Sequence, residues 1–245
     1  MNHSRFFLIL LVLFLSNALH FGLSIILFIL SFCYGGNVRN SIINRQFRYC
    51  YHYSAIVLIF INVAVYLLTE FYPGLVYYLS MVPSFVLYKH FYWQFFTYMF
   101  VHANFAHLFG NMLSLLLFSI LLERAIGTKE FLLYYILCGT LAGVASFFSY
   151  LVAGTNVVLL GASGAVYAIM LLFAVIYPNS KIFLFGILPI RAPVLTLFYF
   201  FIEFFSQFAS DGVAHATHLY GMLFGYLYIR IRMRIKPLKV WNIIS

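Results

Sequence analysis

The sequence predicts an all-α polytopic membrane protein with six membrane-spanning helices and one extra hydrophobic helix at the N-terminus. The chain has 245 residues, of which 65% are hydrophobic and only 8% are charged, whereas an average soluble domain carries about 25% charged residues. The apolar residues also gather into runs that approach the roughly 20 residues needed to cross a bilayer. These runs cover residues 5–34, 54–71, 105–122, 131–151, 161–177, 193–209 and 213–230.

Composition and loop signals divide the chain into three expected parts. They are a hydrophobic helix with a basic linker at 1–50, a membrane domain at 51–235 and a basic cytoplasmic tail at 236–245. The run at 5–34 is too long for the short apolar region of a cleaved signal peptide. We expect it to be an additional helix with its N-terminus outside, and an interfacial or re-entrant segment is the alternative.

The net charge of +9 is distributed as a topology signal. Basic residues lie between or beyond the apolar runs rather than on one polar face, which argues against nucleic-acid binding and for contact with the lipid bilayer. The six spans are numbered from residue 54 onward. Almost all basic residues lie in the segments that this numbering places inside, so both ends of the six-span unit are predicted to be cytoplasmic. We expect a multi-pass protein of the cell (inner) membrane. The inner basic residues are Arg39, Arg45, Arg48, Arg124, Lys129, Lys181, Arg191, Arg230, Arg232, Arg234, Lys236 and Lys239.

Polar side chains enter three of the predicted spans at one depth. His107 and Asn111 lie in the second span, Ser163 near the start of the fourth and His218 near the start of the sixth. All three spans enter from the predicted outer side. Ionisable groups inside a membrane are costly and usually face a partner or a cavity. A polar site in the outer half of the bilayer is therefore predicted, because scattered core histidines would not share one depth.

Small residues on two of these spans predict that the helices approach closely. His218, Gly221 and Gly225 fall at positions i, i+3 and i+7, which is one stripe of the sixth span. Glycine and alanine crowd the start of the fourth span around Ser163. Small residues let helices in a membrane come close together. The two stripes would bring His218 to Ser163.

Three motifs resemble those of the rhomboid intramembrane serine proteases. Residues 161–164 read Gly-Ala-Ser-Gly, which resembles the family's nucleophile motif, and the last-span stripe after His218 resembles another. The third is the second-span pattern formed by His102, His107 and Asn111. The resemblance covers about 54–235 and departs at Trp93-Gln94, where the family often has Trp-Arg. It implies a six-transmembrane-helix rhomboid bundle.

The resemblance also implies roles for individual residues and a substrate class. Ser163 would be the nucleophile and His218 its general base. The substrates would be single-pass membrane proteins, cut near the outer end of their helix after entry beside the fifth span, under a mobile cap near 207–212. The expected oxyanion and support residues are His107, Asn111, Tyr167 and Gly161.

The acids of the chain favour a Ser–His dyad over a triad. There are only five, and Glu123 and Glu130 lie on the predicted cytoplasmic side. Glu203 and Asp211 could reach the outer level, but neither matches a catalytic position of the family. We expect Tyr167 to orient the histidine instead, and we leave His102 and His215 outside the catalytic set.

Three other functions compete with the serine endopeptidase. A catalytically silent rhomboid-like protein that binds membrane clients would be expected to lack Ser163 or His218. A metal or haem protein would leave Ser163 and its glycines unexplained, and a transporter would need charges that the spans lack. We therefore expect no metal and no cofactor. The oligomeric state stays open.

Overall fold

The computed structural model describes residues 47–184, 186–207 and 213–242. The extra helix expected at 5–34 lies outside these residues, as does the expected cap apart from Gln207. Nothing in the described part therefore bears on either expectation.

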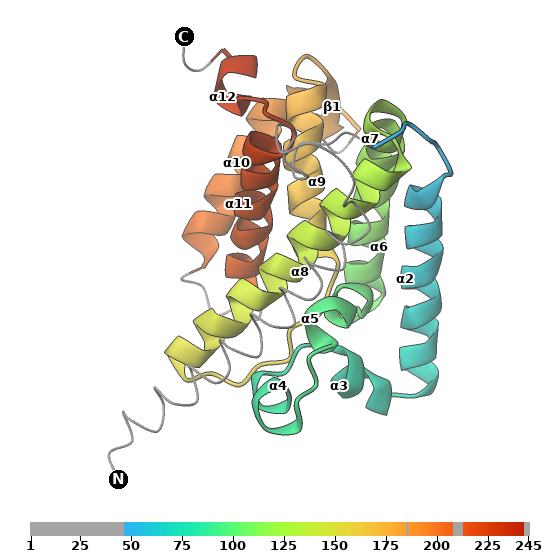
Figure 1. The fold of residues 1–245 in the computed structure, drawn as a ribbon, viewed down its shortest axis with the longest axis vertical. Coiled ribbons are helices and arrows are strands. Elements are labelled where there is room, and N and C mark those ends of the chain that lie inside the picture. The colour runs from blue at the N-terminus through green and yellow to red at the C-terminus, as the bar shows by residue number, and fades with distance from the viewer. Residues whose placement is uncertain (1–46, 185, 208–212, 243–245) are drawn as a thin grey trace, which may run out of the picture. The chain divides into compact units, whose positions relative to one another are not determined.

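The described chain is a bundle of long helices (Figure 1). The second predicted span begins as α6 and continues through a π-helical turn, η3, into α7, and such turns are frequent at functional sites. From residue 54 onward, the other long helices correspond one to one with the remaining apolar runs. The long elements are α2 (Ser54–Phe71), α6 (Phe105–Ser114), η3 (Leu115–Ser119), α7 (Ile120–Ile126), α8 (Thr128–Ala153), α9 (Ser163–Ile176), α10 (Ala192–Ser206) and α11 (His215–Ile231).

Shorter elements fill the connections. Four short helices lie in the segment between α2 and α6. An antiparallel hairpin joins α9 to α10, with Lys181 opposite Arg191. Gly186 closes that hairpin with a φ of 74°, a left-handed conformation that favours glycine. The short elements are α3 (Gly74–Leu79), α4 (Pro83–Lys89), α5 (Gln94–Thr97), η2 (Tyr98–Phe100), β1 (Lys181–Leu184), β2 (Leu188–Arg191) and α12 (Pro237–Val240).

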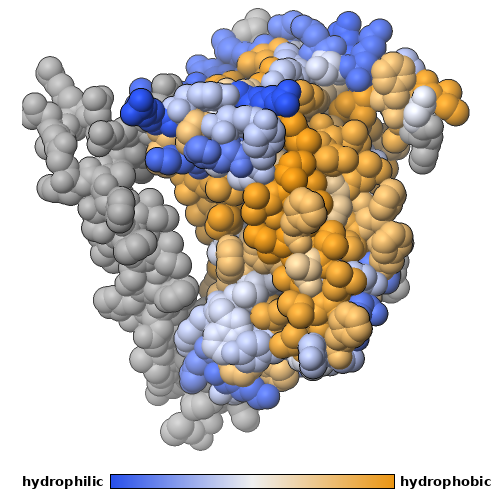
Figure 2. All heavy atoms as spheres, turned by 90° about the vertical axis from the view of Figure 1, so that its right-hand side faces the viewer, coloured by the Kyte–Doolittle hydropathy of each residue, from blue (hydrophilic) through white to orange (hydrophobic). Residues whose placement is uncertain are grey.

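The surface and the helix lengths identify an integral membrane protein. Among the described residues, α2, the continuous helix Phe105–Ile126 and α8 have 18, 22 and 26 residues and are apolar enough to cross a bilayer. Helices α9 and α10 are apolar but shorter. Figure 2 shows an apolar band between two hydrophilic ends. Phe60 of α2 is 70% exposed, as expected for a side chain that faces lipid. The count of six spans stays a prediction.

Helix α9 forms the core of the bundle. Eleven of its 14 residues are buried, and it packs against α8, α10 and α11. A Cβ atom on Gly221 of α11 would lie only 1.9 Å from the carbonyl oxygen of Gly164. A Cβ on Gly225 would lie 2.5 Å from the hydroxyl of Tyr134. The two helices therefore meet backbone to backbone, as the small residues predict.

The segment expected as a basic tail contacts the helix bundle. Residues Pro237–Val240 form α12, and the indole Nε1 of Trp241 donates a hydrogen bond of 2.9 Å to the carbonyl of Ala174 at the end of α9. Just before this segment, Arg232 forms a 2.6 Å ion pair with Glu130 of α8. The sequence did not predict this attachment, because an apolar and basic run does not reveal what it contacts.

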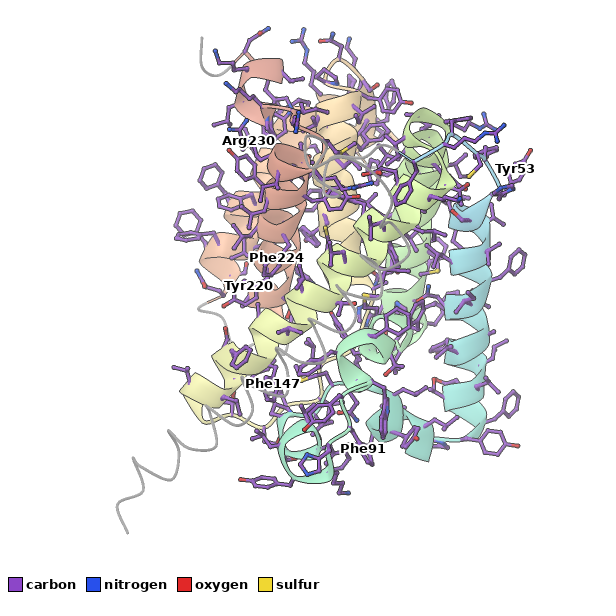
Figure 3. All side chains as sticks on the ribbon, viewed as in Figure 1. Tyr53, Phe91, Phe147, Tyr220, Phe224 and Arg230 are labelled. Carbon is purple, nitrogen blue, oxygen red and sulfur yellow. The ribbon has the colours of Figure 1, made fainter. Side chains whose placement is uncertain are left out.

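The bundle has two distinct ends. Helices α6, α9 and α11 all begin toward the end that carries α3, α4 and α5, which is the lower end in Figure 1. Phe91 and Phe147 lie near this end in Figure 3, whereas Tyr53 and Arg230 lie near the other. The polar residues at the starts of α6, α9 and α11 are thus on the side away from Arg230.

Candidate active site

Ser163 is the first residue of α9 and follows a tight turn. Gly161 adopts a φ of 118°, which side chains disfavour. A Cβ at this glycine would also lie 2.7 Å from Cε1 of the His107 ring. The amide of Gly161 donates a 2.9 Å hydrogen bond to the carbonyl of Tyr98. Glycine is thus needed both to form the turn before Ser163 and to admit His107 beside it.

His218 meets Ser163 across the interface between α9 and α11. The Nε2 atom of His218 lies 2.7 Å from Oγ of Ser163, which is a hydrogen-bond distance. Helices α9 and α11 contact each other at Gly164 and Gly221, about one turn from His218, and this close packing brings His218 within reach of Ser163. A further contact of 2.7 Å, between the hydroxyls of Thr217 and Ser146, ties the same turn of α11 to α8.

The ring of His218 is held on two sides. The ring of Tyr167 stacks on it with centroids 4.5 Å apart and an interplanar angle of 9°. Nδ1 of His218 lies 2.9 Å from Oε2 of Glu203 on α10. The same carboxylate oxygen lies 2.6 Å from Nδ1 of His215, and the hydroxyl of Tyr167 donates to Oε1 of Glu203.

The sequence prediction missed Glu203 as a neighbour of the serine–histidine pair. Its side chain is buried, with 5% of the residue exposed. The signal was present, because Glu203 is a lone acid inside an apolar run and such residues usually face a partner. What the sequence could not supply was the partner. His218 lies on another helix, whose rotation relative to α10 follows only from packing.

His107 and Asn111 lie on one face of α6 beside Ser163. Asn104 caps the helix by accepting a 2.8 Å hydrogen bond from the amide of His107, and Asn111 Nδ2 donates a 2.9 Å bond to the carbonyl of His107. The amide of Ala103 donates a long, 3.4 Å bond to Nδ1 of His107. With Nδ1 as acceptor, the ring proton belongs on Nε2, the nitrogen that faces Gly161.

A cavity of about 730 Å³ lies beside Ser163. Its volume falls in the usual range for small-molecule pockets, about 300–1,000 Å³. Side chains of α6, α9, α10 and the hairpin form its walls. The predicted site residues in those walls are Ser163, His107, Asn111 and Tyr167.

His102 and Gln94 are buried polar residues of the segment that precedes α6. The His102 ring is 3% exposed and makes an edge contact with His107 at 5.0 Å. Burial and the neighbouring His107 lower the pKa of His102 to about 4. Gln94, at the position where the family often has arginine, accepts a 3.0 Å bond from the amide of Val82 and donates to the carbonyl of Tyr77 at 2.8 Å. Its amide thus joins α5 to the segment around α3 and α4.

One cluster among the described residues has the composition of a metal site. Glu203, His215 and His218 offer ligand atoms within 4.8 Å of one another. The separations of 2.6 and 2.9 Å between the carboxylate and the two rings are those of direct hydrogen bonds. Nε2 of His218 is engaged by Ser163. The expected absence of a metal stays a prediction.

Fold and site together define a helical integral membrane protein with a partly buried serine–histidine pair near one end of its bundle. The family model described as the Rhomboid domain matches residues 89–235. That range covers more than half of the chain and contains Ser163, His218 and the residues around them. The chain belongs to the rhomboid family.

Three curated relatives match parts of the chain. "Putative rhomboid protease YdcA" of Bacillus subtilis (strain 168) is 31% identical over 137 residues, covering 55% of this chain and 64% of the relative. "Rhomboid-related protein 1" of Caenorhabditis elegans is 35% identical over 161 residues, covering 60% and 43%. "Rhomboid-like protein 11, chloroplastic" of Arabidopsis thaliana is 35% identical over 114 residues, covering 46% and 38%. The chain thus spans less than two thirds of the length of each.

Proposed function

We propose that this protein is an intramembrane serine endopeptidase that cleaves transmembrane-helix substrates near the outer side of the bilayer. In this proposal Ser163 is the nucleophile and His218 the general base. The observation that carries it is the 2.7 Å contact between Nε2 of His218 and Oγ of Ser163. A serine hydroxyl is a weak nucleophile at neutral pH and needs an adjacent base.

The reaction follows from this contact. As Oγ of Ser163 attacks the scissile carbonyl, its proton passes to Nε2 of His218. That proton is then donated to the leaving amine, which completes acylation. A water molecule subsequently hydrolyses the acyl-enzyme, with His218 again as the base. The cavity at Ser163 supports the proposal, since hydrolysis within an apolar bundle requires space for water and for the substrate strand.

Negative charge on the substrate oxygen needs donors beside Ser163. Asn111 Nδ2 and the Nε2–H of His107 are suitable side-chain donors from α6. The backbone N–H of Ser163 is a third, because the first N–H groups of a helix have no partner within it. Each well-aimed donor is worth roughly 3–4 kcal/mol in the transition state. The turn at Gly161 favours this arrangement by admitting the His107 ring.

The membrane topology extends the proposal. We infer that residues 51–235 form the protease domain, that its six long helices all span the bilayer, and that both ends of this unit are cytoplasmic. Arg230 lies at the end of the bundle opposite the starts of α6, α9 and α11 (Figure 3). Positive charge concentrates on the cytoplasmic side, so the serine would face the outer half of the bilayer. Substrates would be single-pass membrane proteins.

The test is cleavage of a model transmembrane substrate by the purified full-length protein in proteoliposomes. Wild-type protein is expected to give two fragments, with the cut near the outer end of the substrate helix by mass spectrometry. Ser163→Ala and His218→Ala should each abolish the fragments without loss of folded protein. A chelator should leave the rate unchanged, because no step uses a metal.

Two outcomes would refute the proposal. Unchanged cleavage by Ser163→Ala would show that another group, or a contaminating protease, does the chemistry. Retention of the substrate without cleavage by folded wild-type protein, across several substrate helices, would favour the catalytically silent, client-binding alternative.

A further inference from the structure

The carboxylate of Glu203 accepts hydrogen bonds from three side chains on two neighbouring helices. Oε2 contacts Nδ1 of His215 at 2.6 Å and Nδ1 of His218 at 2.9 Å, and Oε1 accepts from the hydroxyl of Tyr167. We propose that Glu203 is a positioning residue that completes a Ser163–His218–Glu203 triad, in place of the dyad predicted from the sequence. This inference rests on the proposed protease function.

With Glu203 ionised, its contact sets the tautomer of His218. An ionised carboxylate has no proton to donate, so Nδ1 of His218 must carry the hydrogen that bridges the 2.9 Å to Oε2. In a neutral imidazole the other nitrogen, Nε2, then holds a lone pair. That lone pair faces Oγ of Ser163 at 2.7 Å. The carboxylate thereby keeps His218 in the form that can accept the serine proton.

The charge of Glu203 also suits the chemistry. When His218 takes the proton from Ser163, it becomes an imidazolium ion inside a buried site, where an unpaired charge is costly. In the proposed triad Glu203 is ionised, and it lies against the opposite nitrogen of the ring. In soluble serine proteases a buried acid acts on the histidine in the same manner, without itself being protonated.

The partners of Glu203 explain how a carboxylate is tolerated on an apolar helix. The residue is 5% exposed, and buried charges are stable only when they are hydrogen-bonded or paired. His215 and the Tyr167 hydroxyl supply bonds that do not involve the reacting nitrogen. Tyr167 also stacks on His218, so the same carboxylate orients both the histidine and the ring that supports it.

Glu203 does not line the cavity that we propose to receive the substrate. Leu195 and Tyr199 of α10 line the cavity at Ser163, but Glu203 is not among the lining residues. Removing its charge should therefore slow the chemical step and leave substrate binding nearly intact. A residue with only a structural role would instead change the amount of folded protein.

The experiment compares kcat and KM of full-length wild type, Glu203→Gln and Glu203→Asp, with active protein counted by exhaustive labelling of Ser163 with a fluorophosphonate. Glu203→Gln is expected to lower kcat at least about 100-fold and to change KM by less than about threefold, since loss of the orienting acid costs on the order of 10⁴ in soluble triads. Glu203→Asp restores a carboxylate on a shorter arm and should recover part of the loss.

A matched control is Glu123→Gln. Glu123 is another buried acid, and it accepts bonds from the amides of Ser54 and Ala55 and from the hydroxyl of Thr128. Its substitution should lower thermal stability while the folded protein keeps its kcat.

Three outcomes are informative. A Glu203→Gln protein with wild-type kcat would overturn the triad while leaving the protease intact. Equal losses in Glu203→Gln and Glu203→Asp, accompanied by equal losses of folded protein, would reduce Glu203 to a structural residue. If wild type neither cleaves substrate nor reacts with the fluorophosphonate, the proposed function itself fails, and that failure is distinct from the first two.

Discussion

Replacing Gly221 with alanine should separate Ser163 from His218 with the smallest possible change in side chain. The new Cβ would lie 1.9 Å from the carbonyl oxygen of Gly164, whereas real Cβ contacts are essentially never shorter than 3.0 Å. The nearest atoms are backbone, so no side chain can rotate away. Helix α11 must therefore move from α9 by at least about 1 Å, the difference between these two distances.

A displacement of that size is sufficient to disable the site. His218 lies one turn from Gly221 on the same helix, so its 2.7 Å contact with Ser163 would lengthen to more than about 3.5 Å, beyond hydrogen-bond range. Misplacement by about 1 Å can lower a rate about 100-fold. Overpacking typically lowers stability by about 1–3 kcal/mol. We expect kcat to fall about 100-fold in protein that still folds.

The assay is turnover of a transmembrane substrate in proteoliposomes, normalised to folded protein from a thermal unfolding curve. Gly74→Ala is the control, because a Cβ at Gly74 meets nothing within 4 Å and should leave turnover unchanged. Wild-type turnover by Gly221→Ala would refute the reasoning, since it would mean that the two helices can separate without moving His218.

Two further predictions concern α6 and the loop before it. Asn111→Ala should lower kcat about 10²–10³-fold, because one oxyanion donor is lost, and an unchanged kcat in folded protein would remove Asn111 from that role. For His102, a folded-state pKa of about 4 means that the unfolded chain binds a proton first as pH falls. Its contribution to stability, roughly 3 kcal/mol, is complete above about pH 6.5 and is lost as pH falls to about 4. His102→Gln should flatten the dependence of the unfolding temperature on pH in this window, and an unchanged dependence in that variant would contradict this reasoning.

The long helices could be predicted from the sequence because lipid imposes a simple length and composition rule. The apolar run at 54–71 coincides with α2, and the run at 161–177 differs from α9 by only a residue or two at each end. The short helices between α2 and α6 were not predicted. Their turns depend on contacts such as the bond that Gln94 donates to Tyr77 and the bond that it accepts from Val82, and such contacts leave no periodic pattern.

The site was predictable to the extent that helix spacing and small residues define it. The glycine stripe on α11 indicated that His218, and not His215, meets Ser163, and the 2.7 Å contact agrees. The same reasoning could not identify Glu203 as a partner of His218, because Glu203 is a single acid in an apolar run and no second charged residue on that helix defines its face. Which way α10 is turned follows from packing against α9 and α11. The contact between Glu203 and His218 is therefore evident only from the structure.

The most direct test of the central claim is whether His218 activates Ser163 for covalent reaction. Purified full-length protein is treated with a fluorophosphonate at neutral pH, and the modified peptide is identified by mass spectrometry. If the pair functions as proposed, the adduct forms on Ser163 in the wild type and is lost in His218→Ala. An adduct that forms equally fast in His218→Ala, or a folded wild-type protein that forms none, would contradict the claim.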